Sequence, residues 1–252
     1  MRGRIGLFGL GAFGRLVADR LPEGSEILAH DPGVTDIPAG RTVLSDLATA
    51  AACPVVILAV PVGAMADVLV AIAPHLRPGA LVVDVGSVKM LPARLMDEFL
   101  PAHVEAVGTH PLFGPQSGRE GIAGLRIAVC PIRSLKAARR VAAYCRHHLD
   151  LNVYFASPEE HDREAAIVQG LTHLIARVLV AMEPLPHRMT TASFERLLEA
   201  IDMVRDDPPT VFSAIQRDNP FAAEVRERFF RLAAETRAEL DCRDSLEGQE
   251  AL

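Results

Sequence analysis

The stretch Ile5-Gly6-Leu7-Phe8-Gly9-Leu10-Gly11-Ala12-Phe13-Gly14 decides the fold of this chain. A short apolar run leads into a Gly-x-Gly-x-x-Gly motif, and residues 15–21 behind it have the apolar spacing of a helix. In such a strand–turn–helix unit the glycines permit a tight turn, close approach of a pyrophosphate and close packing of helix on strand. The free N–H groups at the helix start attract phosphate. The predicted dinucleotide-binding residues are Gly9, Leu10, Gly11, Ala12, Phe13 and Gly14.

An acidic residue, Asp31, ends the second expected strand, 25–30. An acid at this place accepts hydrogen bonds from the adenine ribose, and its charge would repel a ribose 2′-phosphate. We therefore predict NAD, rather than NADP, as the cofactor. The alternative is an ordinary glycine-rich turn followed by a second turn, since Asp31-Pro32-Gly33 is also good turn chemistry. The strand, the glycines and the acid together favour the dinucleotide site.

Composition sets limits on the class of protein. Half of the 252 residues are hydrophobic and 23% are charged, so one large domain or two smaller ones can form a sizeable core. The net charge of −6 argues against a nucleic-acid surface. The four cysteines have no paired spacing, which indicates reduced thiols and a cytoplasmic location. The chain has no run of about 18 uninterrupted apolar residues, so we expect no membrane span.

Strands and helices alternate from residue 5 to residue 155, which predicts a Rossmann-type doubly wound parallel sheet. From Pro158 to Leu240 almost everything has helical character, interrupted by prolines, so an all-helical second domain follows. We divide the chain into a dinucleotide-binding domain, 1–157, and a helical substrate and dimerisation domain, 158–252. The last residues, 244–252, are expected to be disordered.

Ligands of doubly wound sheets bind beyond the carboxyl ends of the strands. The segments at Val60-Pro61, Ser87 and His110 should therefore converge on the reactive end of the cofactor. His110 lies in a stretch, 108–118, that is too rich in glycine and proline for a regular element. A neutral histidine there can take a proton from a substrate hydroxyl, although a loop histidine that bonds its own backbone is an equal alternative. Ser87 could bridge a substrate oxygen to that base, but its position alone favours a helix N-cap.

His161, Gln169 and His173 share a broad face of one expected helix. A polar cluster on an otherwise apolar helix suggests the wall of a pocket. The two histidines do not have the i, i+4 spacing of a metal-binding pair, so we predict no metal.

Several stretches, in order along nearly the whole chain, resemble the prephenate/arogenate dehydrogenase family. They are the glycine motif 9–14, Asp84-Val85-Gly86-Ser87-Val88-Lys89, Gly108-Thr109-His110-Pro111-Leu112-Phe113-Gly114-Pro115-Gln116-Ser117-Gly118 and Glu160-His161-Asp162 with Gln169 and His173. The resemblance implies that His110 accepts the proton of the substrate's ring hydroxyl and that Ser87 hydrogen-bonds this hydroxyl and the base. It also implies a homodimer through the helical domain and a substrate pocket lined by His161, Gln169, His173 and Lys89.

The function implied by the resemblance is NAD-dependent oxidative decarboxylation of a small molecule, prephenate, to 4-hydroxyphenylpyruvate in tyrosine biosynthesis. The alternative is an arogenate dehydrogenase that gives tyrosine directly, or an enzyme for both substrates. Prephenate-using members often carry an Arg where this chain has Asp202 or Met203, and the segment 193–198 looks closer to plant arogenate dehydrogenases. Asp162 could pair with the ammonium of arogenate.

Two rival interpretations remain within the sequence. A dehydrogenase of the β-hydroxyacid type would use a lysine on the first long helix of its second domain, but 159–182 contains none. A non-catalytic NAD-binding protein would keep the glycines and Asp31, with no reason to keep His110, Ser87 and His173 together.

Overall fold

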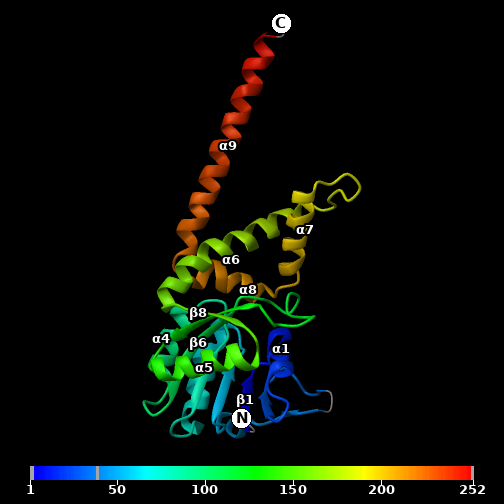
Figure 1. Ribbon diagram of the computed structural model, residues 1–252. Coiled ribbons are helices and arrows are strands. Elements are labelled where there is room, and N and C mark those ends of the chain that lie inside the picture. The colour runs from blue at the N-terminus through cyan, green and yellow to red at the C-terminus, as the bar shows by residue number, and fades with distance from the viewer. Residues whose placement is uncertain (1–2, 38–39, 251–252) are drawn as a thin grey trace.

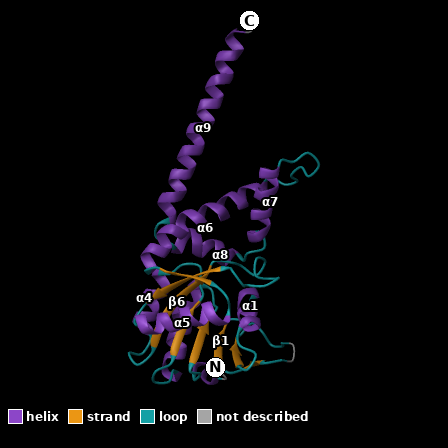
Figure 2. Cartoon of the chain, viewed as in Figure 1, coloured by secondary structure: helices purple, strands orange, loops and turns teal. Residues whose placement is uncertain are grey.

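The protein, described by a computed structural model over residues 3–37 and 40–250, has a sheet domain and an entirely helical part (Figures 1 and 2). The sheet of the described residues has eight strands in the order β3-β2-β1-β4-β5-β6-β7-β8. Their bounds are β1 Arg4–Phe8, β2 Glu26–His30, β3 Thr42–Leu44, β4 Val55–Leu58, β5 Leu81–Asp84, β6 Glu105–Pro111, β7 Arg126–Pro131 and β8 Asn152–Phe155. This arrangement confirms the doubly wound α/β fold.

The sheet is mostly, but not wholly, parallel. Strands β1 to β6 run in one direction, whereas β7 pairs antiparallel with β6 and parallel with β8. A parallel return requires a crossover of a dozen or more residues, usually a helix. The connection 112–125 contains no helix and brings the chain directly back beside β6. The predicted doubly wound sheet is therefore mostly parallel, and β7 and β8 run opposite to β1–β6.

Helices cover both faces of the sheet. On one face lie α1 Ala12–Arg20 and α5 Leu135–His148; on the other lie α2 Leu47–Ala51, α3 Met65–Ile72 and α4 Met90–Phe99, with short 3-10 turns η1 Val62–Ala64 and η2 Ala73–His75 beside α3. Neighbouring residues of one strand serve opposite layers, since Val56 packs with the α2–α4 layer and Ile57 with α1. The continuous apolar runs of the central strands follow from this two-sided burial.

The helical part begins at the place where the sequence predicts the domain boundary, which itself stays a prediction. Ser157 caps α6 Pro158–Ala181 with a reciprocal pair of hydrogen bonds to Glu160, which makes a capping box. The remaining helices are α7 Ala192–Val204, α8 Pro209–Ser213, the π-helical turn η3 Ala214–Asp218 and α9 Ala222–Glu250. The breaks before α7, α8 and α9 contain the prolines that the sequence analysis took as helix interruptions.

Helix α9 projects far from the body of the molecule (Figure 1). It continues to Glu250, so the expected disorder from residue 244 was wrong as far as 250, and 251–252 lie outside the described residues. Extending an existing helix costs far less than starting one, because each added residue gains a backbone hydrogen bond without a new nucleus.

Helix α6 is, within the described residues, the one helix long and apolar enough to cross a membrane by length and composition. Its mean hydropathy over 18 residues is 1.4, and 22% of that window is buried. The same helix buries His161 and Asp162 at its first turns, whereas Ile167, Val168 and Val178 are exposed. This apolar helix is thus attached to the sheet domain through buried polar residues near its start.

Candidate active site

The glycine motif forms the turn between β1 and α1. Gly9 has φ +95°, and a Cβ there would lie 2.4 Å from the carbonyl oxygen of Ala59. A Cβ on Gly14 would lie 2.1 Å from the carbonyl oxygen of Gly9, so this glycine permits close packing of α1 on the turn. A Cβ on Gly11 would meet nothing within 4 Å. Gly11 is the N-cap of α1 and makes no side-chain cap, so the start of α1 has open space beside Gly11, which fits a pyrophosphate.

Asp31 follows β2 and is tied to this turn. Its Oδ2 accepts a hydrogen bond from the backbone N–H of Leu10 at 2.7 Å, and its Oδ1 accepts from the N–H of Gly33 at 2.9 Å. Each carboxylate oxygen retains a further lone pair for a ribose hydroxyl. Asp31 therefore both holds the turn and offers acceptors beside it, which fits a dinucleotide.

The three segments predicted to converge, at Val60-Pro61, Ser87 and His110, lie at the carboxyl ends of the neighbouring strands β4, β5 and β6. Leu58 of β4 is level with Asp84 of β5, which is level with Gly108 of β6. Val60 and His110 therefore each lie two residues beyond this line, and Ser87 lies three beyond it. His110 itself belongs to β6, which reaches Pro111, so the expected irregular structure at this position was wrong. The β6–β7 ladder pairs His110 with Ala128 and fixes its backbone.

His110 lies at the end of a buried chain of hydrogen-bonding side chains. Its Nδ1 is 2.8 Å from Nε2 of His161, and Nδ1 of His161 is 2.8 Å from Oδ1 of Asp162. All three residues are buried, with exposed fractions of 5%, 6% and 0%. The structure therefore brings the predicted base from β6 together with His161 from α6.

The surroundings of His110 favour its neutral form. Burial, the largest cause, lowers the pKa of His110 well below 6.5, and the Lys89 charge acts in the same direction, as would a positive charge on His161 or His173. A histidine that is neutral across the physiological range is ready to accept a proton.

Lys89 is held in a buried ion pair. Its Nζ donates to both carboxylate oxygens of Asp84 at 2.6 and 2.5 Å, and the two side chains are 1% and 0% exposed. Burial raises the pKa of Asp84, and the Lys89 charge opposes that rise. The Lys89 ammonium is buried and engaged by Asp84, so its predicted role in binding the substrate stays a prediction.

Ser87 follows β5 in the segment that leads to α4. It is partly exposed and, within the described residues, its hydroxyl makes no hydrogen bond, with His110 or otherwise. The N-cap of α4 is Lys89, not Ser87. The capping alternative for Ser87 was therefore wrong, and its hydroxyl is free to meet a ligand.

The other predicted pocket residues lie further along α6. His173 is buried, with Nδ1 at 3.0 Å from the backbone oxygen of Gln169 and Nε2 at 3.0 Å from Oδ2 of Asp207. The side-chain oxygen of Gln169 is buried without a hydrogen-bond partner. This leaves one unsatisfied acceptor beside His173, available to a ligand that brings a donor.

Asp162 does not have the role that the sequence suggested for it. Its carboxylate accepts from His161 and from the backbone N–H groups of Lys89 and Met90, and it has no exposed surface. It is therefore not available to the ammonium of arogenate.

The sequence analysis assigned no role to Asp84 or Asp207. Both are partners of predicted site residues, one of Lys89 and the other of His173. Asp84 ends an apolar strand, and an acid at the end of a buried strand signals a buried partner. For Asp207, 34 residues from His173, the sequence holds no comparable signal.

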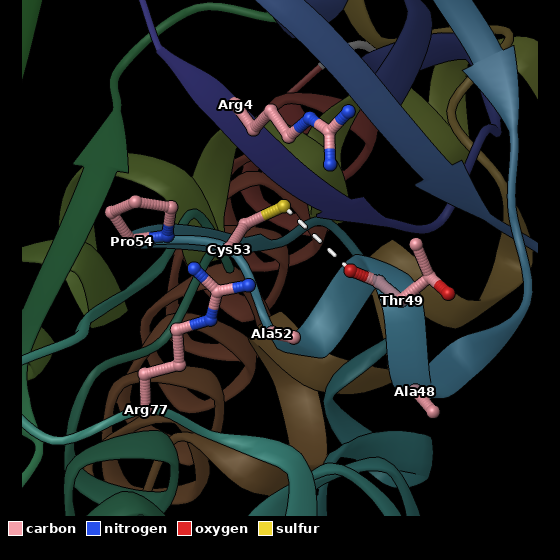
Figure 3. A pocket seen from close by; sticks show the side chains of 7 residues that line it. All are labelled: Arg4, Ala48, Thr49, Ala52, Cys53, Pro54 and Arg77. Carbon is pink, nitrogen blue, oxygen red and sulfur yellow. Dashed lines mark hydrogen bonds between the residues drawn. The ribbon is translucent and has the colours of Figure 1, made fainter.

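Two cavities lie away from these residues. One of them has a volume of about 350 Å³ and is lined by Arg4, Ala48, Thr49, Ala52, Cys53, Pro54 and Arg77 (Figure 3). Arg4 begins β1 and Pro54 precedes β4, so this cavity lies at the amino ends of the strands, opposite His110. Across the part of the chain that the structure describes, no three His, Cys, Asp or Glu residues gather as they would around a metal.

Together, the sheet, the glycine turn and the buried histidine at the strand ends define a two-domain dinucleotide-binding protein. Models of two protein families match the chain, "Prephenate dehydrogenase, nucleotide-binding domain" at residues 33–124 and "Prephenate dehydrogenase, dimerization domain" at residues 157–247. The chain belongs to the prephenate/arogenate dehydrogenase family.

Among curated relatives, a probable arogenate/prephenate dehydrogenase of Methanocaldococcus jannaschii is 29% identical over 72% of this chain and 42% of its own length. Arogenate dehydrogenase 1 of Arabidopsis thaliana, a chloroplastic protein, is 31% identical over 90% of this chain and 37% of its own length. The chain thus spans less than half the length of these two relatives.

Solved structures agree in fold. Prephenate dehydrogenase from A. aeolicus, in complex with hydroxyphenyl propionate and NAD+, has a TM-score of 0.74 at 20% identity, covering 97% of this chain and 92% of that one. Synechocystis arogenate dehydrogenase has a TM-score of 0.65 at 16% identity, covering 96% and 93%.

Proposed function

We propose that this protein catalyses the NAD-dependent oxidative decarboxylation of prephenate to 4-hydroxyphenylpyruvate. The observation that carries the proposal is the buried, neutral His110 at the carboxyl end of β6. The glycine turn lies at the same end of the sheet, after β1. Membership of the family supplies the substrate class.

In this proposal His110 removes the proton of the substrate's ring hydroxyl. Burial keeps the imidazole neutral, and β6 holds it in place, so the base needs little reorganisation when the substrate arrives. The Ser87 hydroxyl, which has no partner of its own among the described residues, hydrogen-bonds the same substrate oxygen. As the ring carbon loses its hydrogen and the ring carboxylate leaves as carbon dioxide, aromatisation supplies the driving force.

The residues that would hold the cofactor are those of the turn, 9–14, with Asp31 and the Val60-Pro61 segment. When bound, NAD accepts the hydrogen of the substrate ring as hydride. Asp31 disfavours a 2′-phosphate by charge repulsion, which supports NAD over NADP.

Arogenate is the second candidate substrate. It is favoured by the buried side-chain oxygen of Gln169, which lacks a donor that an ammonium group would bring. The likeness to the plant arogenate dehydrogenases points the same way. Against it stands the full engagement of Asp162. Prephenate-using members often carry an arginine where this chain has Asp202 or Met203. Arg205 does not replace it for a substrate carboxylate in this arrangement, because its guanidinium forms ion pairs with Glu183 and Asp202.

We also propose that the protein is a homodimer through its helical domain. The match to a dimerization domain supports this, and so do apolar side chains that the single chain leaves exposed. These residues lie on α6, α7 and α9: Ile167, Val168, Val178, Leu197, Phe230 and Leu232. Larger apolar patches of this kind mark interfaces between proteins.

The test is NADH formation with prephenate and arogenate offered separately, each with NAD and with NADP. Turnover of prephenate with NAD supports the first candidate, and turnover of arogenate alone supports the second. Absence of turnover with both substrates, in a protein that binds NADH, would refute the proposed function.

A further inference from the structure

Asp162 stands outside the reaction described above, yet both of its carboxylate oxygens are engaged in hydrogen bonds. Its Oδ1 accepts from the N–H of Lys89 at 2.7 Å and from His161, and its Oδ2 accepts from the N–H of Met90 at 2.8 Å. The backbone oxygen of the same residue accepts from Nδ2 of Asn219 at 2.7 Å. Such saturation holds the carboxylate in one orientation.

The hydrogen bonds of Asp162 fix where protons sit on the two histidines. Both of its oxygens accept from backbone N–H groups, so toward His161 the carboxylate is also an acceptor, and Nδ1 of His161 carries the proton. Nε2 of a neutral His161 is then an acceptor, so the proton between the rings belongs to Nδ1 of His110. The remaining nitrogen, Nε2 of His110, is left with a bare lone pair, which is the form that a base requires.

The same carboxylate also links the two domains. Lys89 is the N-cap of α4 and Met90 its first residue, and the Lys89 side chain makes no cap of its own. Asp162, from α6, supplies the missing acceptors for these first N–H groups. The segment that carries Ser87 is thereby anchored to the helical domain.

We propose that Asp162 is a positioning residue that sets the tautomers of His161 and His110 and, through α4, holds the Ser87 segment beside the base. When His110 takes the substrate proton, the O–H bond breaks and an Nε2–H bond forms. The proton between the rings can then shift from Nδ1 of His110 to Nε2 of His161, which places the positive charge beside the Asp162 carboxylate. This inference rests on the proposed function for its catalytic consequence, but the tautomers can be measured without turnover.

The experiment combines ¹⁵N NMR of the histidine rings with turnover of the substrate that the wild type accepts. Wild type should show both His110 and His161 protonated at Nδ1, with assignments from the loss of signals in His110→Asn and His161→Asn. In Asp162→Asn the amide can donate to His161 and reverse the chain, so His110 should acquire an Nε2 proton. Turnover should fall by about 10²- to 10⁴-fold, the range for a lost general base, while NADH binding persists.

A second variant and a matched control separate this role from helix capping. His161→Phe leaves the Asp162 cap on α4 in place but breaks the chain to His110, so it should lose turnover as Asp162→Asn does. Asp46 caps α2 in a similar way, with Oδ1 accepting from the N–H of Thr49 at 2.8 Å, and lies away from the site. Asp46→Asn should keep both the tautomers and the turnover.

The possible results separate the tautomer assignment from the proposed function. An Nε2 proton on His110 in the wild type overturns the inference, whatever the activity. Turnover retained in either site variant, or lost without a change of the His110 tautomer, overturns it as well. A wild type that shows the expected tautomers but converts neither prephenate nor arogenate refutes the proposed function and leaves the tautomer assignment standing.

Discussion

Removing one partner of the buried pair Lys89–Asp84 should destabilise the protein with a characteristic pH dependence. Lys89→Met leaves a carboxylate with no exposed surface and no counterion. Breaking a buried pair from one side costs about 3–5 kcal/mol, because the remaining charge loses its partner but not its desolvation penalty.

The sign of the pH dependence follows from the direction of the Asp84 shift. Burial already raises the pKa of Asp84 in the folded protein, and the Lys89 charge opposes that rise. A folded-state pKa above the unfolded value gives stability that is full below the unfolded value of 3.8 and is lost as pH rises through the folded value. In Lys89→Met the opposing charge is gone, so folded Asp84 stays protonated to higher pH while the unfolded chain is ionised. Stability should then fall as pH rises above 3.8, by at most about 1.4 kcal/mol per pH unit, which is the limit for one proton.

The assay is urea unfolding followed by far-UV circular dichroism at pH 5, 6 and 7, at one protein concentration. Asp84→Asn removes the titrating carboxyl and leaves the ammonium buried without its counterion, so this variant should be destabilised without the Asp84 slope. The double variant Asp84→Asn/Lys89→Met should lack that slope as well. A Lys89→Met deficit that is independent of pH, or equal slopes in the two single variants, would refute the reasoning.

Other expected outcomes concern the base and the cofactor turn. His110→Asn should cut turnover by about 10²- to 10⁴-fold with NADH binding intact, and the wild-type kcat/KM should keep its plateau below pH 6.5, because burial lowers the pKa of His110; equal activity in both proteins would contradict its role. Gly14→Ala, whose Cβ would meet the Gly9 carbonyl oxygen, should lower the melting temperature, whereas Gly11→Ala should fold normally and weaken NADH binding measured by fluorescence; the reverse pattern would exclude this division of roles. Asp31→Ser should raise the NADP/NAD ratio of kcat/KM, and an unchanged ratio would remove Asp31 as the discriminating residue.

The short-range parts of the fold could be predicted because their signals are local. The glycine motif specifies the turn, the continuous apolar runs 54–61 and 80–85 specify buried strands, and the prolines after Pro158 specify helix breaks, all through residues close in sequence. The strand β3, Thr42–Leu44, was missed because three residues in a stretch rich in proline and glycine give no alternation to detect. The extension of β6 through His110 was missed because its pairing with β7 outweighs the local turn composition.

The sequence by itself determined the class of sheet and the glycine turn, and it singled out His110 as the proposed base together with the polar residues of α6. Only the tertiary structure decided what those side chains do to one another. Asp162 caps a helix that begins 72 residues earlier and hydrogen-bonds His161, which contacts His110 of the sheet domain, and Lys89 is turned inward to Asp84. Such contacts depend on how whole layers pack, because a buried charge takes whichever partner the fold brings within hydrogen-bond distance, and no local pattern encodes that choice.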